Sequence, residues 1–194
     1  MKKIFALLIV ITFIACHSTK YTHSGNVNSR LDFKKGKWLL HTVEAPKSIK
    51  ESLTNIANEK FTALLGNRFS DVNTTRRILL PANITTNLSK AVLKDIKNGT
   101  GYDFFIKINA AVISDEVGIL GQGNIMSSSE NRDEVTVTIY DLNLLEEMYS
   151  QSVVGNVFVP ENYDNLALTK STRSIIIKGF KRIMKNIHKN QIKN

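Results

Sequence analysis

The chain has 194 residues, with 26 lysines and arginines, 17 aspartates and glutamates, and one cysteine. A single cysteine excludes an internal disulfide and any multi-cysteine metal site, and the length suits one domain with a proper core. The positive charge is local, because eight of the bases and none of the acids lie between residues 167 and 194. The basic balance therefore does not favour a nucleic-acid partner, and we expect none.

The first residues have the organisation of a secretory signal. Lys2 and Lys3 precede a mostly apolar run of twelve residues, Ile4 to Ala15. Such a run is shorter than the roughly 18 residues that a permanent membrane helix needs. We therefore predict that residues 1–15 are a cleaved signal peptide.

The end of this signal, Phe13-Ile14-Ala15-Cys16, resembles the lipobox of bacterial lipoproteins, with Phe13 where that family usually has Leu. The resemblance implies cleavage before Cys16 and acylation of its thiol, including palmitate, which is sufficient for stable membrane anchoring. In that family an Asp after the cysteine marks the inner membrane. Here His17 follows, which implies lipid anchoring in the outer membrane with the domain facing the periplasm. An ordinary secretory signal with a coincidental cysteine is the alternative.

The segment after Cys16 is polar and has no periodicity, so residues 16–35 are predicted to be the lipidated cysteine and a flexible tether. A random coil of this length reaches about 20 to 25 Å on average. A single periplasmic domain is expected to occupy residues 36–194.

The first half of this domain is predicted to alternate strands and helices. A strand at Lys37–Val43 precedes a helix at Ser48–Leu65, for which Ser48 and Glu51 form a capping-box pattern and Gly66 supplies the end. A second strand is expected at Arg76–Leu80 and a second helix at Asn87–Lys97, closed by Asn98-Gly99.

The second half changes from helical to strand periodicity. Alternating apolar residues predict strands, and polar stretches predict the connections between them. The expected segments are a strand at 103–114, a further strand at 119–126, a polar loop at 127–133, a strand at 134–142, a turn at 141–146 and a partner strand at 147–159.

A long amphipathic helix is expected at residues 165–190. Its apolar face carries Ile176, Phe180, Ile183 and Ile187. Its opposite face carries a basic stripe of Lys178, Arg182, Lys185 and Lys189.

The element order is β-α-β-α, then antiparallel strands, then a C-terminal helix. It predicts an α/β (α+β) fold in which helices cover a mixed sheet.

The domain also resembles a group of periplasmic lipoprotein domains that includes the curli-secretion channel protein, the penicillin-binding-protein activator and the N-terminal domain of the Tol-system propeller protein. The resemblance is carried by residues 37–45 (KWLLHTVEA), 93–112 (LKDIKNGTGYDFFIKINAAV), 134–155 (EVTVTIYDLNLLEEMYSQSVVG) and the closing helix. It implies architecture rather than activity, because members of the group include pore subunits and regulators of cell-wall synthases.

No constellation of residues predicts catalysis, a metal site or a cofactor. The histidines are scattered, since His17 and His23 fall in the tether, His41 on a strand and His188 on the last helix. The carboxylate pairs at 115–116 and 146–147 lie near expected turns, where solvated charge is the ordinary explanation. The glycines at 118, 121 and 123 lack the lysine and helix that a phosphate loop requires.

The basic stripe on the last helix is the one sequence feature that favours a binding function. It is either a solvated outer face or a contact for an anionic partner such as lipid headgroups, lipopolysaccharide phosphates or an acidic protein surface. The preferred hypothesis is a non-enzymatic envelope lipoprotein that binds a protein partner or helps to assemble a complex. The alternatives are a subunit of an outer-membrane secretion pore and a cell-wall-acting enzyme, and homo-oligomer formation is left open.

Overall fold

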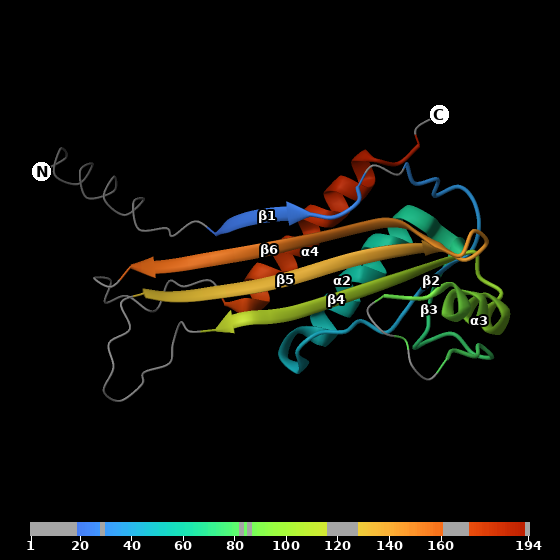
Figure 1. Ribbon diagram of the computed structural model, residues 1–194, viewed down its shortest axis with the longest axis horizontal. Helices are drawn as coiled ribbons and strands as arrows, with labels where there is room; N and C mark the ends of the chain where they lie inside the picture. The colour runs from blue at the N-terminus through green and yellow to red at the C-terminus, as the bar shows by residue number, and fades with distance from the viewer. Residues whose placement is uncertain are drawn as a thin grey trace, which may run out of the picture.

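One mixed sheet organises the computed structural model, which describes residues 19–27, 30–81, 84, 87–115, 128–160 and 171–192. The α+β prediction is confirmed, with helices covering the sheet (Figure 1). The strands are β1 (Lys20–Ser24), β2 (Trp38–Leu40), β3 (Phe69–Asp71), β4 (Phe104–Asp115), β5 (Ser128–Asp141) and β6 (Glu146–Pro160). The helices are α2 (Lys47–Leu65), a short 3-10 turn η1 (Gly66–Arg68), α3 (Lys90–Thr100) and α4 (Thr172–Lys189).

The strand order is β1-β6-β5-β4-β2-β3. The short strand β2 pairs in parallel with both β3 and β4, as expected for strands joined by helical crossovers. The long strands β4, β5 and β6 form an antiparallel meander, and β1 adds to the far edge of β6 in antiparallel orientation. A turn at residues 142–145 joins β5 to β6, as predicted.

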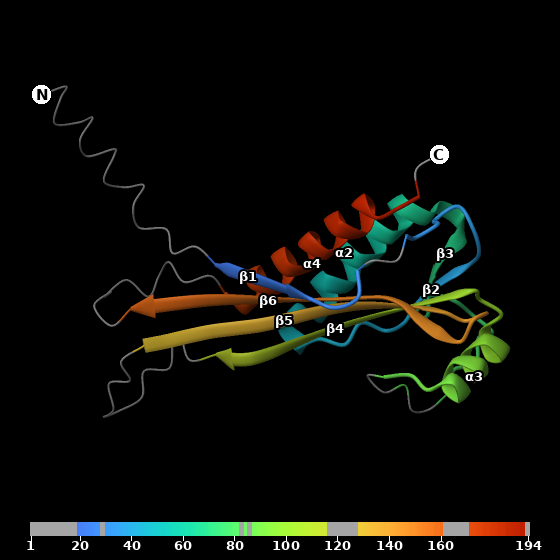
Figure 2. The same cartoon turned by 45° about the horizontal axis from the view of Figure 1, so that its top comes forward.

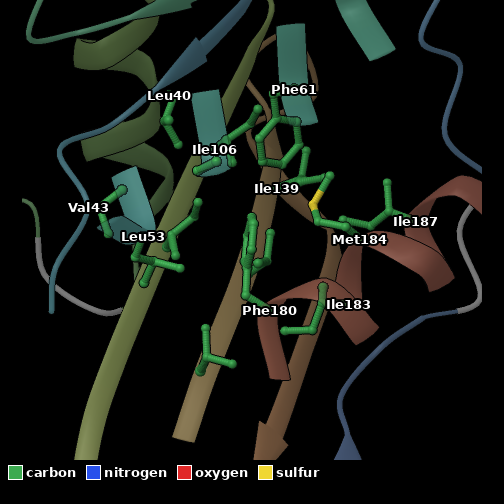
Figure 3. Packing of buried hydrophobic residues seen from close by; sticks show 14 of the residues in the cluster. Leu40, Val43, Leu53, Phe61, Ile106, Ile139, Phe180, Ile183, Met184 and Ile187 are labelled. Atoms are coloured by element: carbon green, nitrogen blue, oxygen red, sulfur yellow. The ribbon is translucent and has the colours of Figure 1, made fainter. Parts of the chain in front are cut away.

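The main core lies between the sheet and the helices α2 and α4, which run side by side on one face (Figure 2). The predicted period of two in β5 is confirmed, because Val135, Val137 and Ile139 are all buried. The predicted apolar face of α4 is confirmed as well. Its buried side chains include Ile176, Phe180, Ile183 and Ile187, and the last three are seen in Figure 3 with Ile106 and Ile139 of the sheet.

A smaller core lies on the opposite face, where α3 covers one end of the sheet. Leu93 and Ile96 of α3 pack there against Phe105 and Tyr140. The predicted end of this helix at Asn98-Gly99 is wrong, because the helix continues to Thr100. Gly101 ends it in the left-handed conformation with φ 71°, which a residue without Cβ adopts at no steric cost.

The helix α2 confirms its predicted span, and Gly66 follows its last residue. The capping box does not form, since Pro46 occupies the N-cap and no side chain caps the helix. Because Pro46 is the N-cap, Ser48 lies at the second position of the helix, where its hydroxyl does not serve as the cap.

Two further predictions are wrong. Residues 76–80 form no strand, and the backbone N–H of Leu79 instead donates to the carbonyl of Gly99 at 2.9 Å. The expected polar loop at 127–133 belongs largely to β5, which starts at Ser128 and pairs with both β4 and β6. Backbone pairing on both sides overrides the polar composition of this stretch.

The largest correction concerns the flexible tether predicted for residues 16–35. Lys20–Ser24 forms β1, and Leu31 and Phe33 are buried in the main core. A backbone bridge also joins Leu31 to Gln191, beyond α4. The folded domain therefore includes residue 20, because pairing with β6 orders a segment whose own sequence carries little strand signal.

Several predicted features lie outside the described residues. These are the signal peptide, Cys16, His17, the strand at 119–126, the glycines at 118, 121 and 123, and the first residues of the helix expected at 165. Across the described part of the chain, no helix has the length and apolar character required to cross a membrane.

Candidate functional site

The predicted basic stripe lies on the outer side of α4. Lys178, Arg182, Lys185 and Lys189 are all exposed. This follows from the amphipathic spacing, because the opposite side of the helix is buried against the sheet.

A cavity of about 290 Å³ lies beside this stripe, between α4 and the edge strand β1. Its lining residues are His23, Arg182, Lys185, Asn186 and Lys189. The structure thus brings together three of the four predicted basic residues and adds His23 and Asn186 to them. Lys178 does not line the cavity.

Arg182 is oriented by an aromatic ring of β1. Its guanidinium carbon lies 4.3 Å from the ring centroid of Tyr21, in cation–π geometry. Tyr21 is half-buried, and burial raises the pKa of its phenol while the charge of Arg182 opposes that rise. The ring therefore stays neutral and provides a fixed platform for the guanidinium.

His23 is held from beneath by a buried chain of polar side chains. The hydroxyl of Tyr149 donates to Gln151 Oε1 at 2.7 Å, and Gln151 Nε2 lies 3.2 Å from His23 Nδ1. An amide nitrogen only donates, so Nδ1 is the acceptor and the neutral ring carries its hydrogen on Nε2. Tyr149 and Gln151 are almost completely buried, and burial raises the pKa of the Tyr149 phenol.

The side chains that line the cavity carry charge of one sign, and the carboxylate of Asp133, which acts electrostatically on Tyr21, is buried and not part of the lining. No carboxylate lines the cavity, and none of the ion pairs among the described residues involves Arg182, Lys185 or Lys189. Like charges at these helical spacings destabilise a helix by roughly 0.2 to 0.5 kcal/mol per pair. An anion in the cavity would remove this repulsion.

A second cavity, of about 560 Å³, lies where β2 and β3 end beside α2, and Asp71 is one of the residues that line it. Asp71 is buried and accepts hydrogen bonds from Asn58 Nδ2 at 2.8 Å and from the backbone N–H of Asn73 at 2.7 Å. The Asn73 side chain donates a third at 2.8 Å. These bonds tie the end of β3 to α2, so the carboxylate has a structural role.

The remaining histidines are not brought together. His41 is partly buried against the ring of Phe105, and burial, with the charge of Lys107, holds the pKa of its imidazole below the usual 6.5. His188 is exposed on α4. Within the part of the chain that the structure describes, no three His, Cys, Asp or Glu side chains group in a way that could hold a metal ion. Glu146 and Glu147 are exposed next to the turn, as expected of solvated charges.

Sequence reasoning found the α4 side of the cavity and missed the β1 side. His23 and Tyr21 were assigned to the tether, because their pairing with β6 joins segments about 130 residues apart. The alternation of Tyr21 and His23 was the only available signal, and it is too short to predict a strand.

Comparison with known proteins gives no family for this chain. No family model matches it, and no curated protein matches it. Among solved structures it is similar to a PelC dodecamer from Paraburkholderia phytofirmans, with 12% identity over 86% of this chain and 98% of that one, and a TM-score of 0.39. It is also similar to the hypothetical protein CT253 from Chlamydia trachomatis, with 8% identity over 79% of this chain and 98% of that one, and a TM-score of 0.38. With identities and TM-scores this low, function has to be argued from the chain itself.

Proposed function

We propose that the protein is an outer-membrane lipoprotein, anchored through Cys16 and facing the periplasm, that acts as a non-enzymatic partner-binding or assembly module. The resemblance of residues 13–16 to a lipobox supports the anchor. The basic surface on α4 and β1 supports binding to an anionic partner.

The observation that carries this proposal is the short distance along the chain between the anchor and the candidate surface. Only residues 17–19 separate Cys16 from β1, which forms one wall of the cavity. A fully extended chain spans at most about 3.6 Å per residue, so the Cα of Lys20 lies within about 14 Å of the Cα of Cys16. The candidate surface would therefore work next to the bilayer.

The contact surface would be the four basic residues of α4. Single exposed charges contribute little to binding, but a cluster steers an oppositely charged partner and fixes its orientation. An acidic protein surface in the envelope is the partner that this arrangement favours. Self-association into a homo-oligomer is the other arrangement to be tested.

The anchor is tested by labelling cells with palmitate and treating them with globomycin. We expect label on the wild-type protein, no label on the Cys16→Ser variant, and accumulation of precursor with globomycin. The labelled protein should fractionate with the outer membrane. An unlabelled wild-type protein would contradict the anchor.

The contact surface is tested by crosslinking in the native envelope followed by mass spectrometry. We expect a quadruple Gln variant at Lys178, Arg182, Lys185 and Lys189 to lose its crosslinked partner. A charge-matched control carries Gln at Lys34, Lys90, Lys94 and Lys181 and should retain it. Equal loss in both variants would show that net charge, rather than this surface, attracts the partner.

Crosslinking together with two further measurements distinguishes the alternative functions. Crosslinks only between copies of this chain, with rings seen by electron microscopy in detergent, would favour a pore subunit. Turnover of purified peptidoglycan would favour a cell-wall enzyme.

A further inference from the structure

We propose that the cavity between β1 and α4 is a binding site for a phosphate group, with His23, Arg182, Lys185 and Lys189 as its ligands. This inference goes beyond the proposed function, because it assigns a small anionic ligand to the cavity, whereas the proposed function assigns an acidic protein partner to the exposed face of α4.

The lining of the cavity matches a phosphate in charge. It combines one guanidinium, two ammonium groups, one imidazole and one amide, with no carboxylate among them. A guanidinium pairs with two phosphate oxygens at once, and an ammonium adds a compact charge with rotatable donors. The imidazole and the amide of Asn186 supply neutral hydrogen-bond donors.

The cavity has room for a phosphate together with a small attached group. Ligand pockets commonly measure about 300 to 1,000 Å³, and this cavity, at about 290 Å³, is at the lower end. It accommodates a phosphate carrying a short alcohol such as glycerol.

Two of the ligands are held in place before anything binds. Arg182 lies over the ring of Tyr21, and His23 is fixed by Gln151, which Tyr149 orients in turn. The buried side chains of Gln151 and Tyr149 favour binding only because His23, which they position, is itself a ligand of the phosphate. Preorganisation of this kind lowers the entropic cost of binding.

The bases of the cavity also lack carboxylate partners among the described residues. By contrast, Lys60 of α2 and Lys97 of α3 each pair with an acid, at 2.9 and 2.8 Å respectively. The three cations lie around a concave surface, and no carboxylate neutralises them. They can therefore attract an anion from solution.

The phosphate could come from a lipid headgroup or from a soluble phosphate ester. His23 lies seven residues beyond Cys16, so an extended chain places it within about 25 Å of the anchor. Headgroups of the anchoring leaflet are therefore within reach, and the experiment has to distinguish the two sources.

The test uses the full mature protein in an uncharged detergent at low ionic strength, with calorimetry to measure Kd. The probes are dihexanoyl phosphatidylglycerol for the headgroup, and sn-glycerol 3-phosphate and inorganic phosphate for the soluble source. We expect the Arg182→Gln and Lys185→Gln variants each to raise Kd at least about tenfold, because each loses a charge-assisted contact. Stronger binding of one class of probe identifies the source.

The matched control is Lys181→Gln, which removes one charge from the same helix at an exposed position outside the cavity. It should leave Kd within about twofold of the wild-type value, since a screened surface charge contributes little. In NMR spectra of the wild-type protein, the ring resonances of His23 should shift when a phosphate probe is added.

Three results would overturn the site. They are no binding by any phosphate probe, an effect of Lys181→Gln as large as that of Lys185→Gln, and His23 resonances that do not move while phosphate binds. Failure of palmitate labelling would instead refute the anchor and leave this titration unaffected, so the two failures are distinguishable.

Discussion

Asp103 joins three segments of the chain at one end of the sheet. Its carboxylate accepts hydrogen bonds from Lys97 Nζ at 2.8 Å and from the backbone N–H of Lys37 at 2.9 Å. Asn143, in the turn between β5 and β6, donates a third at 3.4 Å. The hydrogen bond from Lys97 is the main reason that the pKa of Asp103 lies below its ordinary 3.8.

This lowered pKa predicts a pH dependence of stability. Because the folded state favours the charged form, the contribution of Asp103 is complete above its unfolded pKa and is lost as the pH falls through its folded pKa. The difference in free energy of unfolding between wild type and Asp103→Asn should be constant at neutral pH and shrink below about pH 4. Urea titrations at a series of pH values measure it, and a difference that does not change with pH would contradict the assignment.

Gly155 allows β1 and α4 to approach the same point of β6. A Cβ at this position would collide with Ile175 Cγ2 of α4 and would lie 2.8 Å from Tyr21 Cε1 of β1. We expect Gly155→Val to lower the free energy of unfolding by roughly 1 to 3 kcal/mol, the usual range for an overpacked core.

The control for Gly155 is Val154→Leu, a neighbouring position on the opposite face of β6. Its effect should stay within about 0.5 kcal/mol, as for most substitutions outside a packed core. Similar losses from both variants, measured by chemical denaturation, would argue against a close approach at Gly155.

Among the elements, β1 is the least expected, and besides its backbone pairing with β6 its main packing contact is made by Tyr21. The ring packs with Val157 and Ile175, whereas most other side chains of β1 are exposed. The Tyr21→Ser variant should release β1 locally without unfolding the domain. Amide hydrogen exchange should accelerate at residues 152–156 of β6, by about tenfold for each 1.4 kcal/mol of lost packing. Unchanged exchange in β6, or acceleration throughout the sheet, would contradict a locally opening strand.

The elements that could be predicted from the sequence are those with several turns or several alternations. The periodicity of α4, α2 and the second part of β5 is long enough to define both type and buried face. The alternation in β4 predicts the strand but not a single buried face, because Phe105 and Lys107 on the other side are buried as well and Val112 is exposed. In contrast, β3 has three residues and β1 has five. Such strands are defined by the neighbours they pair with, and pairing partners far apart in sequence are not visible in a local pattern.

The residues of the candidate site also divide into those that could be predicted from a local pattern and those that could not. Arg182, Lys185 and Lys189 follow from helical spacing alone, so the sequence predicted them. His23 joins them only through the pairing of β1 with β6. The hydrogen-bonded chain through Tyr149 and Gln151 could not be predicted for another reason. A polar residue such as Gln151 at a core-facing position of a strand interrupts the alternation of apolar residues, so the sequence pattern does not indicate that it is buried.

For the whole molecule, the inclusion of β1 in the sheet sets how far the domain would extend from the lipid anchor proposed at Cys16. A flexible tether of the predicted length would span about 20 to 25 Å on average. The three residues 17–19 instead keep the Cα of Lys20 within about 14 Å of the Cα of Cys16. We expect a ten-residue Gly/Ser insertion between Ser18 and Thr19 to reduce energy transfer from a fluorophore at Lys20→Cys to acceptors among the headgroups. The introduced thiol is the only free one when Cys16 is acylated. Equal transfer with and without the insertion would show that residues 17–19 do not limit the distance.

The edge position of β1 also matters when a shortened form of this domain is prepared. A polypeptide that starts at residue 36 would follow the domain boundary predicted from the sequence. It would lack β1, and the outer edge of β6 would then have no paired strand. That edge would present a row of unpaired amides and carbonyls, flanked by Val153 and Val157, to other molecules. Such a shortened protein should precipitate or form fibres at concentrations where a version starting at His17 stays monodisperse.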